Sequence, residues 1–81
     1  MITVAYQSKD VCFLKTFGSR LRRYRLHQRM TQEELAELAG FSRSYYTEIE
    51  TGKRNISLLN IRRLAEALDI PVKELFDFPF E

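Results

Sequence analysis

The sequence predicts a compact all-α domain of five helices, built around two short helices joined by a tight turn. Three observations support this fold class. Apolar residues recur at three- and four-residue spacing along most of the chain, which is typical of amphipathic helices. Ser or Thr residues suited to helix N-caps precede three of these stretches. Glycine or proline stands where the periodicity breaks.

The central stretch runs from Thr31 to Asn55 and contains the second and third expected helices. Thr31 is a good N-cap, and a glutamate three residues later completes the pattern of a capping box. Gly40 ends this helix because glycine adopts a left-handed conformation at little cost. Ser42 then caps the third helix, which Gly52 ends. So few residues between the two helices require them to cross steeply.

Amphipathic stretches flank the centre. The first helix is expected over residues 11–28, with the apolar stripe Leu14, Phe17, Leu21 and Tyr24. The fourth helix is expected from Ser57, with the core stripe Leu58, Ile61, Leu64, Ala65 and Leu68. A short fifth helix follows Pro71. Residues 11–76 then form one domain, residues 1–10 an N-terminal arm, and residues 77–81 an aromatic tail. The arm is expected to be loosely held, although a strand pairing across a dimer or a segment packed on the domain is also compatible with its sequence.

Composition limits the class of protein. With 81 residues and 44% hydrophobic content, the chain has room for one small folded domain. Its single cysteine allows no intramolecular disulfide, and we expect neither a metal site nor a cofactor. The sequence shows no membrane span and no signal peptide, which favours a cytoplasmic protein.

Charge is segregated along the chain although the net charge is only +2. Residues 15–29 contain six basic residues and no acid, and residues 53–63 contain four basic residues and no acid. If these blocks share a face, that face attracts phosphates. Alternation of charge on solvated helices is the simpler alternative.

The third helix carries the candidate binding residues. Steep crossing leaves one of its faces exposed, and this face contains Arg43, Ser44, Thr47 and Glu48. Arg suits guanine, and Ser or Thr hydroxyls bond several base edges in a major groove. Glu48 either accepts a hydrogen bond from cytosine, or it repels phosphate and so restricts the range of DNA sequences that the protein binds. These residue types predict recognition of double-stranded DNA.

Residues 32–51 resemble the helix-turn-helix of the Cro/phage-repressor (xenobiotic-response-element type) regulators. The resemblance rests on Gln32, Ala36, Gly40, Ile49 and the run Glu50-Thr51-Gly52-Lys53, and it extends over residues 17–76. The continuation RNISLLNIRRLAEALDIPVKELF is most similar to small controller proteins of restriction–modification systems, and many phage repressors end similarly. Tyr46 departs from the family, which usually has Ile or Val there, and a buried tyrosine needs a partner for its hydroxyl. The resemblance implies a repressor-like five-helix fold with the helix-turn-helix at helices 2–3.

The resemblance also implies roles for individual residues. Arg25 is expected to form a half-buried ion pair with Glu50, which would set the angle between the first and third helices. The loop after the third helix would lie along the DNA backbone, with phosphate contacts from Lys53 and Asn55. Arg54 would either join these contacts or reach into a groove. Gln32 and Tyr45 would hold further phosphates at the edges of the two short helices.

The C-terminal segment is more aromatic than a small domain requires. We expect a homodimer interface formed by Leu75, Phe76, Phe78 and Phe80, because exposed apolar patches commonly mark partner surfaces and because the fifth helix pairs subunits in the resembled family. The alternative is that these rings fold back on their own core.

The function that we predict is sequence-specific binding of a palindromic operator by a homodimeric regulator, with RNA polymerase as a further candidate partner. It would be a restriction–modification controller or, alternatively, a prophage-type repressor. A second hypothesis is an antitoxin or adaptor that binds a protein, but such a protein would favour apolar residues on the exposed face of the third helix. An enzyme is not expected, because one Cys, one His and no glycine-rich loop leave no catalytic constellation.

Overall fold

The computed structural model describes residues 7–79 and contains four α-helices and one 3-10 helix in that range. The α-helices are α1 (Ser8–His27), α2 (Gln32–Ala39), α3 (Arg43–Glu50) and α4 (Leu58–Leu68), and the 3-10 helix is η1 (Val72–Phe76). The all-α class is therefore confirmed, but the fifth element is a 3-10 helix of five residues where we expected an α-helix.

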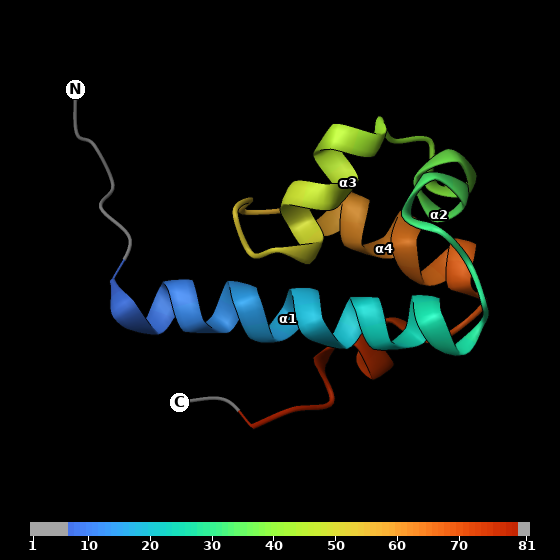
Figure 1. Ribbon diagram of the computed structural model, residues 1–81. Helices are drawn as coiled ribbons and strands as arrows, with labels where there is room; N and C mark the ends of the chain where they lie inside the picture. Colours follow the sequence, from blue (N-terminus) through green and yellow to red (C-terminus); the bar gives the residue numbers. More distant parts are fainter. Residues whose placement is uncertain (1–6, 80–81) are drawn as a thin grey trace.

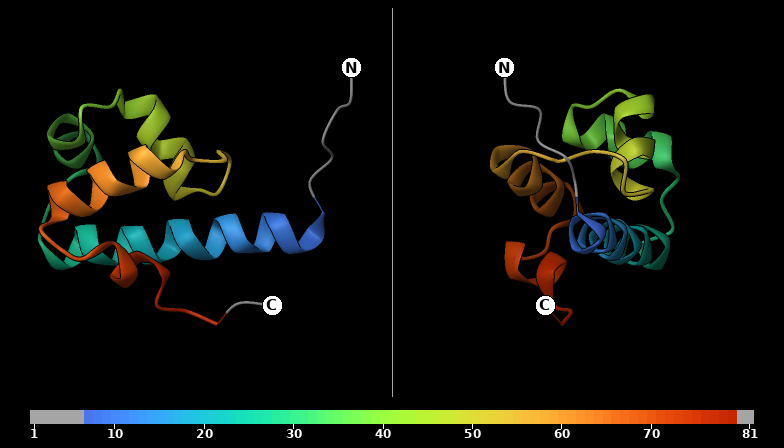
Figure 2. Two further views of the ribbon diagram at one scale, coloured as in Figure 1. Left: turned by 180° about the vertical axis from the view of Figure 1, so that it is seen from behind. Right: turned by 90° about the vertical axis from the view of Figure 1, so that its left-hand side faces the viewer.

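The long helix α1 lies along one side of the molecule, and the other elements pack around its second half (Figure 1). Contacts join α1 to α3, α2 to both α3 and α4, and η1 to both α1 and α4. Viewed almost along α1, η1 lies on the side of that helix opposite α3 (Figure 2). The same helix thus supports α3 on one side and the C-terminal segment on the other.

Helix α1 begins three residues before the expected start at residue 11. The backbone N–H of Gln7 donates to the carboxylate of Asp10, at 2.9 Å, so this acid at the third helical position closes the first turn. Gln7 is not a residue that marks an N-cap in a sequence, which explains the missed start. Helical residues 8–10 fall within the predicted arm, and residues 1–6 lie outside the described part of the chain.

The predicted helix boundaries around the centre are confirmed by the observed caps. The hydroxyl of Thr31 accepts from the backbone N–H of Glu34 (3.0 Å), and the Glu34 carboxylate accepts from that of Thr31 (2.8 Å). Gly40 ends α2 with a φ of 79°. The hydroxyls of Ser42 and Ser57 cap α3 and α4. These local contacts fix where α3 begins before any long-range packing is considered.

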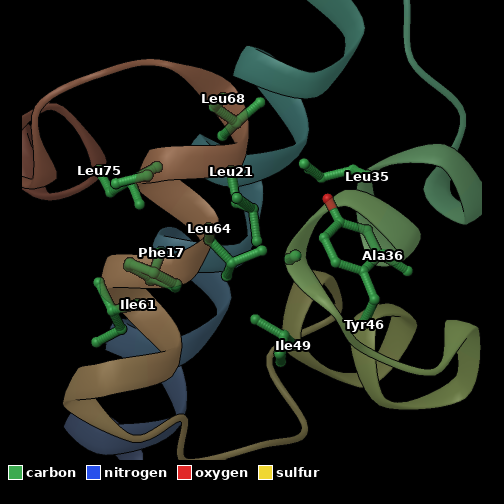
Figure 3. Close-up of a cluster of buried hydrophobic side chains, with 12 residues drawn as sticks. Phe17, Leu21, Leu35, Ala36, Tyr46, Ile49, Ile61, Leu64, Leu68 and Leu75 are labelled. Carbon is green, nitrogen blue, oxygen red and sulfur yellow. The ribbon is translucent and has the colours of Figure 1, made fainter.

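Side chains from all five elements meet in one core (Figure 3). Its buried apolar residues are Phe17, Leu21, Leu35, Ala36, Ala39, Tyr46, Ile49, Ile61, Leu64, Ala65, Leu68 and Leu75. Leu58 was expected in the stripe of α4, but its side chain is 76% exposed. It is the first helical residue after the cap at Ser57, so it projects from the end of α4 and does not reach the core.

Candidate nucleic-acid interface

The outer face of α3 gathers the four predicted base-contact residues. Arg43 and Ser44 are exposed, Thr47 and Glu48 are half-buried, and the four side chains together line one shallow surface. Because these residues lie at positions one, two, five and six of an eight-residue helix, they form a single stripe. The structure therefore presents to solvent a polar surface that offers a guanidinium, two hydroxyls and a carboxylate.

The inner face of α3 is held by a buried ion pair. The Arg25 guanidinium donates from Nε to Glu50 Oε2 at 2.9 Å and from Nη2 to Glu50 Oε1 at 3.0 Å. The side chains of Arg25 and Glu50 are only 8% and 2% exposed. The hydroxyl of Tyr46 also donates to Glu50 Oε2. We call Arg25, Glu50 and Tyr46 the buried triad; it contains the expected ion pair and supplies the partner that a buried Tyr46 requires.

The electrostatics of the buried triad favour the charged carboxylate and the neutral phenol. Burial opposes ionisation of Glu50, but the hydrogen bonds from Arg25, Tyr46 and Gln32 outweigh it and lower the pKa of Glu50. Burial, together with the hydrogen bond to Glu50, raises the pKa of the Tyr46 phenol. The bidentate hydrogen bond to Glu50 raises the pKa of Arg25. The carboxylate therefore remains an acceptor for every donor around it.

Gln32 connects the buried triad to the outer face of α3. Its Nε2 donates to Glu50 Oε1 at 3.1 Å, and its Oε1 accepts from the hydroxyl of Thr47 at 3.2 Å. The side chain predicted to hold a phosphate is thus bonded at both ends of its amide within the protein. The sequence did not predict this bridge, in which Gln32 of α2 is bonded to both Glu50 and Thr47 of α3.

Close approach of α1 and α3 depends on a residue without a side chain. A Cβ placed on Gly18 would collide with the backbone carbonyl oxygen of Glu50 and would lie 2.8 Å from that of Ile49. Gly18 therefore allows the two backbones to touch. At the end of α3, Gly52 adopts a φ of 78° and lies against the backbone of Lys15. These contacts place the C-terminal end of α3 directly on α1.

The loop after α3 carries the predicted phosphate contacts, and Lys53, Arg54 and Asn55 are all exposed. Arg54 Nε donates to Glu48 Oε1 at 3.1 Å, and its guanidinium lies 5.3 Å from the centre of the Tyr45 ring. The Tyr45 hydroxyl accepts from Nδ2 of Asn60 at 2.9 Å. Arg54 and Tyr45 therefore form one surface with Glu48, at the edge of the outer face of α3.

Known proteins are similar to this chain in sequence and in fold. The HTH_3 family model, described as helix-turn-helix, matches residues 21–75, which include α2, α3, α4 and most of η1. The chain belongs to this helix-turn-helix family. Control protein C.BamHI of Bacillus amyloliquefaciens is 43% identical over 63 residues, covering 76% of this chain and 78% of that protein. Control protein C.MunI of Mycoplasma is 39% identical over 61 residues, covering 74% and 82%.

Among solved structures, the restriction–modification controller protein C.AhdI from Aeromonas hydrophila superposes with a TM-score of 0.77. It is 52% identical in sequence, and the match covers 78% of this chain and 96% of that protein. Family membership and these relatives identify the chain as a DNA-binding helix-turn-helix transcriptional regulator that is similar to controller proteins.

In this helix-turn-helix regulator, two basic residues of α1 that the sequence did not single out border α3. Arg22 Nε lies 3.8 Å from Glu50 Oε1, yet the Arg22 side chain is 61% exposed. Lys15 lies against Gly52, next to Lys53. The sequence shows that both residues belong to the basic block 15–29. Which side of α1 faces α3 becomes clear only from the contact at Gly18. They add positive charge beside the C-terminal end of α3.

The C-terminal residues of the regulator are placed differently from the predicted dimer interface. Leu75 is fully buried in the core of its own chain, so it has no surface left for a partner, and its assignment to an interface was wrong. Phe76 and Phe78 are half-buried, with Phe76 5.2 Å from the Phe17 ring and Phe78 5.5 Å from the Phe13 ring, measured between centroids. These rings therefore fold back on the core of their own chain. Phe80 lies outside the described residues.

None of the helices in residues 7–79 combines the length and the apolar character that crossing a membrane requires. Within the same range, no three His, Cys, Asp or Glu side chains are grouped so that they could hold a metal ion.

Proposed function

We propose that this regulator binds a double-stranded operator with inverted half-sites as a homodimer, and that α2 and α3 form its DNA-binding helix-turn-helix. The observation that carries the proposal is the pair of faces on α3. The inner face is anchored by the buried triad, while Arg43, Ser44, Thr47 and Glu48 are left together on the outer face. A rigidly seated helix with a polar outer face suits insertion into a major groove.

Within this proposal, Arg43 donates to the O6 and N7 of a guanine, the pairing that its fork geometry favours. Ser44 and Thr47 bond neighbouring base edges. Glu48 accepts from a cytosine amino group or, while it is paired with Arg54, holds that guanidinium beside the groove. Direct base contacts of this kind would supply the sequence preference.

Phosphate contacts come from the rim around α3. Lys53 and Asn55 are exposed in the loop. On α1, Lys15 lies against Gly52 at the start of the loop, and Arg22 lies near Glu50 at the end of α3. Arg54 joins them where it leaves Glu48. Such contacts position the protein on the duplex without specifying sequence.

The control of a restriction–modification system is the proposed biological role, supported by the similarity to C.BamHI, C.MunI and C.AhdI. Regulation would follow from occupancy of a promoter, with RNA polymerase as the protein that is blocked or contacted.

The homodimer requires an apolar surface other than Leu75. Leu58 and Leu59 are adjacent and are 76% and 64% exposed at the start of α4. Asn60, the next residue, bonds Tyr45 of α3, so the start of α4 lies beside α3. The two-fold axis of a palindromic operator passes between the two copies of α3. Leu58 and Leu59 are therefore better candidates than Leu75 for contact with a second copy.

Exchange of both leucines for glutamate tests this surface. Sedimentation should show a shift from dimer to monomer, whereas Leu38→Glu, a change of an exposed leucine on α2, should leave the dimer intact. If the double variant remained as dimeric as the unmodified protein, the partner surface would lie elsewhere.

Two further substitutions test the division between base and backbone contacts on an operator obtained by selection. Arg43→Ala should lose about 1–3 kcal/mol on that operator and relax the preference at one base position, while weak binding persists. Lys53→Ala should weaken binding to all sequences alike and reduce the salt slope by about 1. Unchanged preference in Arg43→Ala would show that the outer face of α3 does not read bases.

A further inference from the structure

Thr47 belongs to both faces of α3. Its side chain lines the outer surface together with Arg43, Ser44 and Glu48. Its hydroxyl is also bonded to Gln32, which is bonded in turn to Glu50 of the buried triad. The bonds in this chain have a direction, because some of the groups in it can only donate and others can only accept.

The direction is set at the buried end. Glu50 accepts from the Arg25 guanidinium, which has donors and no acceptor. An ionised carboxylate has no proton to give, so the Gln32 group that faces Glu50 Oε1, at 3.1 Å, has to be the amide nitrogen. The carbonyl oxygen Oε1 of Gln32 is therefore turned toward α3.

The same reasoning fixes the hydroxyl of Thr47. A carbonyl oxygen only accepts, so the Thr47 hydroxyl donates its proton to Gln32 Oε1 across 3.2 Å. A hydroxyl has one proton and two lone pairs. Once its proton points inward, Thr47 presents only lone pairs on the outer face of α3.

We propose that Thr47 recognises an exocyclic amino group in the major groove, the N6 of adenine or the N4 of cytosine, and that Gln32 is the positioning residue that sets this preference. The proposal rests on the proposed DNA-binding function and names the chemistry of one of its base contacts. Among major-groove edges, these amino groups are the donors, whereas the N7 atoms of purines and the oxygens of guanine and thymine are acceptors. An acceptor-only hydroxyl discriminates against those acceptor atoms.

The proposal assigns Gln32 a different role from a phosphate contact. Both ends of its amide are bonded within the protein, so a phosphate would have to displace one of these bonds. Ser44 offers a natural comparison, since it is a second hydroxyl on the same surface and is exposed, whereas Thr47 is half-buried beside Gln32.

The test begins with selection of binding sites from a random duplex library by the unmodified protein and by Thr47→Val. Valine keeps the shape of threonine and removes only the hydroxyl. The base pair at which preference falls in Thr47→Val is the pair that Thr47 contacts, and Ser44→Ala should lose preference at a different position.

Synthetic duplexes then change single groups at that base pair. One duplex lacks the amino group, with purine in place of adenine or 2-pyrimidinone in place of cytosine, and the other has a 7-deaza purine that lacks the N7 acceptor. We expect the unmodified protein to lose about tenfold in affinity without the amino group, the effect of about one hydrogen bond, and to bind the 7-deaza duplex normally. Thr47→Val is the control for any weakening of the duplex itself. Because this variant lacks the hydroxyl, it should bind the amino-free duplex and the natural duplex with nearly equal affinity.

Gln32→Met tests the positioning role, with folding checked by its melting transition. Without the carbonyl acceptor, the Thr47 hydroxyl rotates freely, so this variant should become sensitive to the 7-deaza change and lose its discrimination at that pair. A uniform loss of affinity with a smaller salt slope would instead show that Gln32 holds a phosphate, and would overturn its positioning role.

The outcomes separate this inference from the proposed function. Selection of no motif by the unmodified protein would overturn the proposed function and this inference with it. A clear motif combined with sensitivity of the unmodified protein to 7-deaza substitution, or with no effect of Thr47→Val at any position, would overturn this inference alone.

Discussion

Two groups of the same chemistry lie on opposite sides of α1. The buried triad joins α1 to α3, and an outer triad of Arg20, Glu74 and Tyr24 joins α1 to η1. The ribbon shows α3 and η1 on opposite sides of α1 (Figure 2). In the outer triad, the Tyr24 hydroxyl donates to Glu74 Oε2 at 2.7 Å, whereas Arg20 Nη2 lies 3.7 Å from that oxygen. Arg20 donates from its Nε to the backbone oxygen of Glu74 at 3.0 Å.

Burial separates the two groups. The Arg25 and Glu50 side chains are 8% and 2% exposed, whereas those of Arg20 and Glu74 are 18% and 37% exposed. Water screens an exposed ion pair and can solvate a charge that has lost its partner. A buried charge that loses its partner is solvated by neither water nor protein, which is strongly destabilising. The comparison indicates that the buried triad sets the seat of α3, while the outer triad only helps to hold the C-terminal segment.

The largest expected difference follows removal of the central carboxylate. Glu50→Ala leaves the buried Arg25 charge unpaired and should lower the free energy of unfolding by about 3–5 kcal/mol. Glu74→Ala, the matched change in the outer triad, should lower it by about 0–1 kcal/mol. Urea unfolding of both variants measures the difference, and equal losses would show that burial does not distinguish the triads.

The next effect concerns the backbone contact beside the buried triad. Gly18→Ala puts a methyl group against the Glu50 carbonyl and should destabilise the protein by about 1–3 kcal/mol, because α1 and α3 would have to separate. Ser19→Ala, on the exposed side of α1, is the control and should be nearly neutral. A Gly18→Ala protein as stable as the Ser19→Ala protein would mean that the helices have room to move apart.

The smallest of the three effects is a dependence on pH. The pKa of Glu50 is lower in the folded protein than in the unfolded chain, so its contribution to stability is present above the unfolded pKa, about 4.3. That contribution is lost as pH falls through the lower, folded pKa. Glu50→Gln should therefore reduce the loss of stability that acid causes in the unmodified protein.

Unfolding free energies measured at a series of pH values between neutrality and acid provide the test. Glu34, whose pKa is lowered by its hydrogen bonds to Thr31, is present in both proteins and affects them alike. The same slope in Glu50→Gln and in the unmodified protein would contradict the assignment.

Local signals in the sequence predicted the elements around α3 well. Thr31, Gly40 and Ser42 act through neighbours within four residues, so their roles as caps could be recognised without the fold. The start of α1 was missed because Gln7 is a poor capping residue, and the interface role of Leu75 was wrong because a one-dimensional pattern does not show which apolar residues the core has room for.

The candidate site divides in the same way. The outer face of α3 follows from helical periodicity and could be predicted, and the pair of Arg25 with Glu50 was expected from a family resemblance. The bridge through Gln32 to Thr47 depends on the distance between two helices that no local signal encodes. Lys15 and Arg22 were overlooked for that reason too, since their side of α1 is defined by its contact with α3.

The most direct test of the central claim, that a rigidly seated α3 reads DNA sequence, is selection of binding sites from a random duplex library with the unmodified protein. The account predicts recovery of two inverted half-sites about one helical turn apart, as expected for a dimer with two such helices. Recovery of no motif, together with binding that disappears at moderate salt, would contradict it and would leave only nonspecific attraction between the basic rim and phosphates.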